Sequence, residues 1–103
     1  MSLRGRGFVA VTIAAASASA GCGGVLYAAE INGASRKLAE AKELGAEHLA
    51  PYEYTYASAH YAKAMSEASE GDYSDAKAFA EVADAYAGKA IELSKAAHRG
   101  AGR

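Results

Sequence analysis

The sequence predicts an all-α protein, in which a small antiparallel three-helix body follows a separate N-terminal helix. Apolar residues recur at steps of three and four between residues 26 and 97, which is the spacing of one face of a helix. Pro51 and Gly71 interrupt this pattern and divide it into three segments. Connections this short make consecutive helices antiparallel.

The composition limits both the size of the core and the classes of partner. The 103 residues are enough for one domain, and alanine, which buries little area per residue, supplies much of the 51% apolar content. With no tryptophan and two phenylalanines, we expect the seven tyrosines to provide much of the core volume. A formal net charge of −1 argues against a nucleic-acid-binding protein, which needs a basic face.

The N-terminal helix has the pattern of a secretory signal peptide, which we assign to residues 1–21. Arg4 and Arg6 make its start positive, and residues 8–20 are uncharged and mostly apolar. This run is shorter than the roughly 20 residues that a membrane-spanning helix needs. The alternative is a retained signal anchor that continues to Ala29, but three glycines just after the run stand where an anchor would have leucines.

Two cleavage sites fit the end of this segment. Ser19-Ala20-Gly21-Cys22 resembles the lipobox of bacterial lipoproteins, although Ser19 stands where that motif usually has leucine. The resemblance implies a cut between Gly21 and Cys22, followed by a diacylglyceryl thioether and an N-acyl chain such as palmitate on Cys22. Residues 18–20 also fit the A-x-A signature of ordinary signal peptidase, and a cut after Ala20 would release a soluble protein with a free thiol. We favour lipidation because the only cysteine stands directly behind the apolar run.

Lipidation would fix the protein to a membrane, with residues 22–25 as a lipidated tether. One acyl chain binds a bilayer only marginally, whereas two or more hold stably. Gly23 follows the cysteine, in place of the aspartate that usually retains lipoproteins in the inner membrane. The resemblance therefore implies the periplasmic face of the outer membrane, and the alternative location, without lipid, is the soluble periplasm. Removal of Arg4 and Arg6 with the signal peptide would take the formal charge to −3.

The first two helices of the body are predicted over residues 26–49 and 51–70. Pro51 suits the first turn of the second helix, where its missing N–H costs nothing, and Gly71 is a typical residue just past a helix end. The apolar face of the first helix comprises Tyr27, Ile31, Ala34, Leu38, Ala41, Gly45 and Leu49. That of the second comprises Tyr54, Ala57, Tyr61, Ala64, Met65 and Ala68.

The third helix is predicted over residues 73–97, with Asp72 as its N-cap. Its inward residues would be Ala76, Phe79, Ala80, Ala83, Tyr86, Ala90, Leu93 and Ala97. Because alanine on facing sides lets helix axes approach, the second and third helices should form a close-packed hairpin. Residues 98–103, with two glycines, are expected to form a disordered tail.

The hairpin resembles a tetratricopeptide unit. Gly71, Tyr73, Ala76 and Ala83 match the turn and second helix of such a repeat, and Ala64 matches the small residue of its first helix. The positions that depart from the repeat are Lys63, Glu67, Ala80 and Gly88. Since about three copies are needed for a binding solenoid, the resemblance implies a helical hairpin and not a peptide groove.

Residues 34–95 resemble a family of short, alanine-rich bacterial lipoproteins with a domain of unknown function. The similar segments are residues 41–46, 50–54, 72–76 and 90–93. This resemblance implies an envelope lipoprotein and supplies no activity.

Tyr52 and Tyr56 are the candidate partner-binding residues. They lie four residues apart and outside the predicted inner face, so they could form an aromatic docking patch for a partner protein or a glycan. The alternative is that the tyrosines of this helix belong to the core and extend their hydroxyls to the surface.

The remaining polar residues predict neither a metal site nor a catalytic site. No two of the three histidines, His48, His60 and His98, are spaced i,i+3 or i,i+4, and the acids are interspersed with lysines. We expect no cofactor and no small-molecule substrate.

We therefore expect a non-enzymatic helical interaction or structural module, held at the membrane through Cys22, that binds a larger envelope protein. The alternative is a soluble, secreted periplasmic helical protein with a structural or chaperone-like role.

Overall fold

The computed structural model describes the backbone of residues 2–102 and the side chains of residues 23–102. It contains four helices, α1 (Ser2–Glu43), α2 (Ala46–Leu49), α3 (Pro51–Ser69) and α4 (Tyr73–Ala101), and residues 2–102 include no strand. The all-α class predicted from the sequence is confirmed. Within this part of the chain, no helix combines the length and the apolar character that crossing a bilayer requires.

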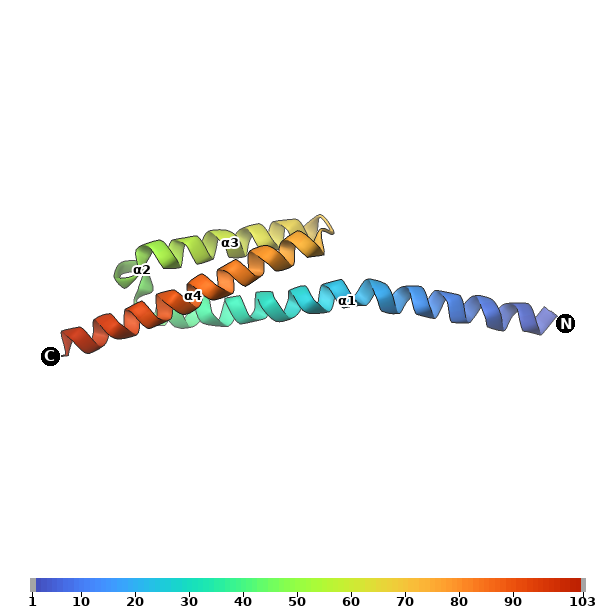
Figure 1. Cartoon of the computed structure of the whole chain (residues 1–103), viewed down its shortest axis with the longest axis horizontal. Helices are drawn as coiled ribbons and strands as arrows, with labels where there is room; N and C mark the ends of the chain where they lie inside the picture. Colours follow the sequence, from blue (N-terminus) through green and yellow to red (C-terminus); the bar gives the residue numbers. More distant parts are fainter. Residues whose placement is uncertain (1, 103) are drawn as a thin grey trace.

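Helix α4 is the central element of the body. It packs along α3 and along the C-terminal half of α1, whereas α1 and α3 make few contacts with each other. Helix α3 runs antiparallel to both of its neighbours, and the N-terminal half of α1 continues past the turn that joins α3 to α4 (Figure 1). The first helix of the body therefore packs on the hairpin, and only the segment before it projects.

Two glycines in the left-handed conformation end helices. Gly45 has φ of 85° and separates α1 from the one-turn helix α2, so the single helix predicted over residues 26–49 is divided. Gly71 has φ of 82° and ends α3, as its sequence position predicts. The N–H groups of Gly71 and Asp72 donate to the carbonyls of Ala68 and Glu67, both at 3.0 Å, which satisfies acceptors that the helix leaves open.

The starts of α3 and α4 follow the predicted signals, whereas the helix predicted to begin at residue 26 is part of α1, which is continuous from Ser2. Pro51 is the first residue of α3, and the side chain of Asp72 caps α4, where its Oδ1 accepts a hydrogen bond from the Asp75 N–H at 3.1 Å. The end of α4 corrects the prediction of a disordered tail over residues 98–103, because the helix continues to Ala101. His98 explains part of this extension, since its Nε2 donates to the Leu44 carbonyl at 2.7 Å and ties α4 to the α1–α2 turn.

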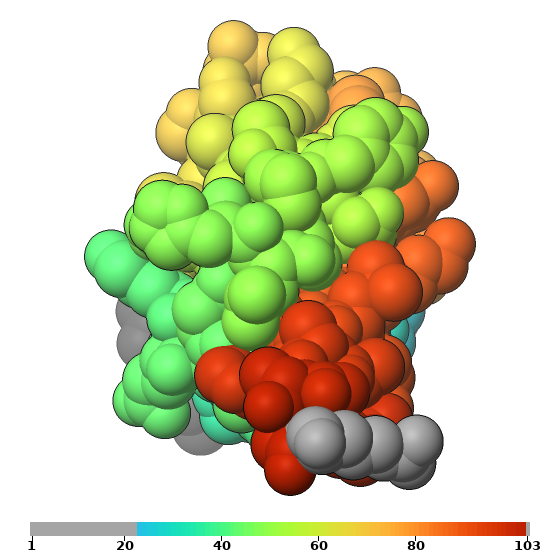
Figure 2. Space-filling view, turned by 90° about the vertical axis from the view of Figure 1, so that its left-hand side faces the viewer, coloured from blue at the N-terminus to red at the C-terminus, as the bar shows by residue number. Residues whose placement is uncertain are grey.

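The last turns of α4 lie beside α2 and the start of α3. Figure 2 views the molecule from this end and shows the three segments in close contact. Ala46, Ala50, Ala90 and Ile91 are buried together here, with Leu44 and Tyr54 packed against them. This cluster closes the end of the body opposite the α3–α4 turn.

The core is built almost entirely from alanine, which corrects the expectation that tyrosine fills it. The buried apolar residues are Ala34, Ala41, Ala46, Ala50, Ala57, Ala64, Ala76, Ala80, Ala83, Ala87, Ala90 and Ile91. All seven tyrosines are half-buried or exposed, and Leu49, Met65 and Leu93, predicted to face inward, are exposed. Methyl groups between the helices bring the axes close, so larger side chains are excluded from the interface and lie along its edges.

Candidate functional site

The predicted pair Tyr52 and Tyr56 belongs to a row of aromatic rings along one edge of the α3–α4 hairpin. Its members, which we name the aromatic strip, are Tyr52, Tyr56 and His60 of α3 and Phe79 and Tyr86 of α4. Along α3, Tyr52 stacks on Tyr56 with ring centroids 5.7 Å apart, and Tyr56 stacks on His60 at 4.1 Å. These i,i+4 contacts follow from helical geometry, which places such side chains one above the other.

Helix α4 completes the strip from the other side. The Tyr86 ring lies 4.3 Å from that of Tyr56 and 6.4 Å, edge-on, from that of Tyr52. The Phe79 ring lies 6.0 Å from that of His60. Tyr56 therefore contacts rings on three sides and joins the two helices, whereas Tyr52 lies at one end of the strip.

Two lysines extend the strip with cation–π contacts. The Lys89 ammonium lies 4.3 Å from the centre of the Tyr86 ring, and the Lys63 ammonium lies 5.9 Å from that of Phe79. Lys63 also pairs with Glu67 at 3.0 Å, which raises its pKa through that hydrogen bond and charge. Among the ion pairs of the described residues, none involves Lys89, so its positive charge remains available beside the exposed end of the strip.

The two predicted binding residues differ in exposure. Tyr52 is 63% exposed, while Tyr56 is half-buried beneath Tyr86 and His60. Both line a shallow depression on α3 together with Pro51, Thr55 and Ala59. The structure thus brings Tyr52 and Tyr56 together at the surface, but only Tyr52 presents much of its ring to solvent.

A second depression follows the contact between α1 and α4. It is open and is lined by Lys37, Glu40, Glu53, Gly88, Lys89, Ile91, Glu92, Leu93 and Lys95. At its α1 side, Lys37 forms a half-buried ion pair with Asp84 at 3.0 Å, which joins α1 to α4. Its lining mixes charges of both signs with the apolar side chains of Ile91 and Leu93.

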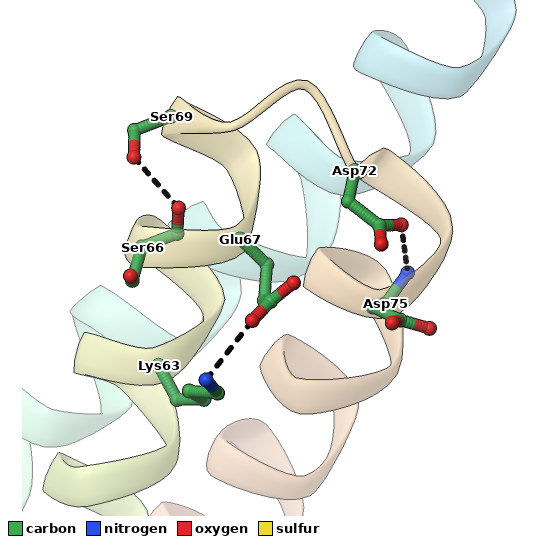
Figure 3. Close-up of polar contacts among 6 residues, drawn as sticks. All are labelled: Lys63, Ser66, Glu67, Ser69, Asp72 and Asp75. Carbon is green, nitrogen blue, oxygen red and sulfur yellow. Dashed lines mark hydrogen bonds and ion pairs between the residues drawn. The ribbon is translucent and has the colours of Figure 1, made fainter.

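Three carboxylates gather at the turn between α3 and α4. Glu67, Asp72 and Asp75 each place one oxygen within 4.8 Å of the others (Figure 3). The negative charge of Asp72 and its hydrogen bond to Asp75 raise the pKa of Asp75 above its usual value. Asp72 caps α4 and Glu67 pairs with Lys63, so two of the three carboxylates have a structural role. The exposure of Asp72 and Asp75 disfavours tight cation binding.

The other predicted site residues lie partly outside the described part of the chain. Gly21 and Cys22, the proposed cleavage and lipidation site, lie where the backbone is helical and the side chains are not described. Of the histidines, His60 is in the aromatic strip, with its Nδ1 2.9 Å from the Tyr56 carbonyl, and His98 fastens α4.

Sequence reasoning missed that Tyr86 is a partner of Tyr56, although the register of the hairpin contains this information. Tyr56 stands fifteen residues before Gly71, and Tyr86 stands fifteen residues after it. An antiparallel hairpin with its turn at Gly71 places the two side by side. His60 and Phe79 follow from the same register, offset by about one helical turn.

These features define a small all-α protein with a helical hairpin, a third helix packed on α4, and an aromatic strip along one edge of the hairpin. Residues 29–101 match the family described as Domain of unknown function (DUF4398), and the chain belongs to this family. The match includes α2, α3, α4 and α1 from Ala29 onward. Comparison with curated proteins and with solved structures gave no significant match.

Proposed function

We propose that this protein is a bacterial envelope lipoprotein, a non-enzymatic helical interaction module held at the membrane through Cys22. The observation that carries the proposal is the position of the only cysteine. It stands directly behind a positively charged start and an uncharged apolar run, and Ala20-Gly21 precedes it. The family match begins at residue 29, so this pattern lies before the matched region and not within it.

Metabolic labelling with a palmitate analogue tests lipidation. We expect label on the wild-type chain and none on Cys22→Ala, which removes the acceptor thiol. Ser17→Ala, a change within the same N-terminal segment that spares the proposed motif, is the matched control and should keep the label. Label that survives Cys22→Ala would contradict the proposal.

The second candidate is a soluble periplasmic protein, with a structural or chaperone-like role, cleaved after Ala20. The A-x-A pattern of residues 18–20 favours it. The mass of the mature chain separates the two candidates. A chain that starts at Gly21 with an unmodified thiol supports the soluble form, and one that starts at Cys22 with added acyl mass supports the lipoprotein on the periplasmic face of the outer membrane.

For the interaction itself, we propose that Tyr52 and Tyr56 contact an envelope protein partner. Aromatic residues are enriched in protein interfaces. Tyr52 is highly exposed and contacts the Tyr86 ring, over which the Lys89 ammonium lies. Crosslinking in intact cells should yield an adduct with the wild-type chain that Tyr52→Ala loses. Met65→Ala, which also truncates an exposed apolar side chain of α3, should retain the adduct. Recovery of monomer alone from wild-type cells would contradict the proposal.

A further inference from the structure

The segment of α1 between Cys22 and Glu30 is apolar around its whole circumference. Residues 23–29 are Gly-Gly-Val-Leu-Tyr-Ala-Ala, and the first charge is Glu30. Val25 is 68% exposed and Leu26 is 55% exposed. We name residues 23–29, together with Tyr73, the apolar collar.

The helical body covers only one side of the collar. The Tyr73 ring lies 5.9 Å from the Tyr27 ring, and a Cβ at Gly23 would lie 3.7 Å from the Tyr73 Cβ. Tyr73 itself is 42% exposed, and Val25, half a turn from Gly23, faces away from it. A helix that is apolar all round is normally buried in a protein or in a membrane, and the protein buries only the side next to α4.

The charges at this end decide which kind of surface fits the collar. Tyr73 is the first residue of α4 and directly follows the turn that carries Glu70. The three clustered carboxylates lie at the same turn, so the end of the hairpin that contacts the collar is acidic. An anionic surface would repel them over a Debye length of about 10 Å at 0.1 M salt. Tyrosine is enriched in the zone where lipid headgroups meet the hydrocarbon.

We propose that the apolar collar rests in the headgroup zone of a zwitterionic lipid bilayer, so that the body stands upright with the α3–α4 turn against the membrane. This inference rests on the proposed lipidation of Cys22, the residue directly before the collar. At about 1.5 Å per residue, the far end of α4 then lies roughly 40 Å from the lipid surface. Tyr52, near the start of α3, is also held well away from the membrane, on the side where a partner can reach it.

The test is fluorescence quenching of the lipidated mature chain, which begins at Cys22, in phosphatidylcholine vesicles that contain brominated lipid. The protein has no tryptophan, so Tyr73→Trp and Leu93→Trp each introduce a single reporter. Both positions are exposed on α4, and about 30 Å of helix separates them. We expect tryptophan at 73 to be quenched at least about threefold more than tryptophan at 93, because only the first lies in the collar.

A second pair of variants tests the collar directly. Val25→Asn with Leu26→Asn should reduce the quenching at position 73 by about half or more, since asparagine disfavours burial in lipid. Leu49→Asn, a matched change of an exposed residue at the opposite end, should leave it unaltered. Replacing part of the phosphatidylcholine with phosphatidylglycerol at low salt should lower the quenching, and stronger quenching would overturn the choice of a zwitterionic surface.

The outcomes separate the orientation from the lipid anchor. If the chain lacks acyl mass or does not float with the vesicles, both the proposed function and this inference are refuted. A lipidated chain that floats but shows equal quenching at both positions, or none at 73, overturns the inference alone. An unquenched but blue-shifted tryptophan at 73 would show that a second copy of the chain covers the collar, and would overturn it as well.

Discussion

Replacing Tyr56 by alanine should destabilise the body much more than the same replacement at Tyr52. Tyr56 is half-buried and has two close ring neighbours, His60 at 4.1 Å and Tyr86 at 4.3 Å. Tyr52 is mostly exposed, and its ring contacts are longer, at 5.7 and 6.4 Å. The two variants remove the same atoms, so the difference between them reports on position alone.

The contacts set the size of the effect. Aromatic pairs contribute about 0.5–1.5 kcal/mol each beyond the area they bury, so two close pairs account for about 1–3 kcal/mol. Loss of the partly buried ring adds about 1 kcal/mol. We therefore expect Tyr56→Ala to lower the free energy of unfolding by about 2–4 kcal/mol, and Tyr52→Ala to lower it by less than about 1 kcal/mol. For a domain of this size, the larger loss corresponds to a Tm lower by roughly 10 °C or more.

Urea and thermal unfolding, followed by circular dichroism at 222 nm, measure both values. A double-mutant cycle with Tyr86→Ala isolates the contact between the helices, and a coupling free energy of about 0.5–1.5 kcal/mol is expected. Equal losses for Tyr52→Ala and Tyr56→Ala would refute the assignment of Tyr56 to the joint between α3 and α4. A coupling free energy near zero would refute the contribution of the Tyr56–Tyr86 contact.

Three further changes test other parts of the fold. Ser94→Ala should raise the free energy of unfolding by about 1 kcal/mol, because the buried Ser94 hydroxyl has no hydrogen-bond partner among the described residues and alanine favours the helix. An unchanged or lower midpoint of urea unfolding would contradict this expectation. Gly45→Ala should cost about 1–2 kcal/mol because of its positive φ, while Gly100→Ala, a helical glycine with open space around it, should cause no loss of Tm. Asp75→Asn should change the pH dependence of Tm. Asp72 raises the pKa of Asp75 above its usual value, so the stability linked to this proton is present below that usual value and is lost as pH rises through the folded pKa. The Tm of the variant should therefore gain on that of the wild type as pH rises through the acidic range in which the Asp75 carboxyl ionises. A gain that shrinks over this range would show that the sign is wrong.

Both ends of α3 and the start of α4 could be predicted because single residues with strong backbone preferences determine them. Pro51, Gly71 and Asp72 act locally, and the structure places each in its expected role. Gly45 has the same kind of effect, but helical spacing continues across it in the sequence, so the division of the first helix was missed. The extension of α4 was missed because it depends on His98 and Leu44, which are far apart in the chain.

The packing faces were harder to predict because α4 contacts two helices. A prediction based on one apolar stripe places Leu93 in the interface. Because α4 is buried on two sides, the residues that are buried in the structure include Ala87, Ile91 and the polar Ser94. The role of tyrosine was missed for a related reason. Side-chain volume indicates what could fill a core, but the distance between helix axes decides what fits, and alanine makes that distance short. Of the candidate site, the sequence predicted Tyr52 and Tyr56, while Tyr86 required the register of the hairpin.

The alanine core reverses the usual logic of mutational scanning. Most proteins lose stability when buried side chains are truncated, and alanine substitution therefore maps their interiors. Here alanine already occupies nearly every buried position, so an alanine scan would leave the interior untouched and would report on the tyrosines at its edges. Enlargement is the informative direction, because even a change to valine or leucine must push two helix backbones apart. A scan with larger residues would trace the contact lines of α4 on α1 and α3, and would show which changes this body can tolerate.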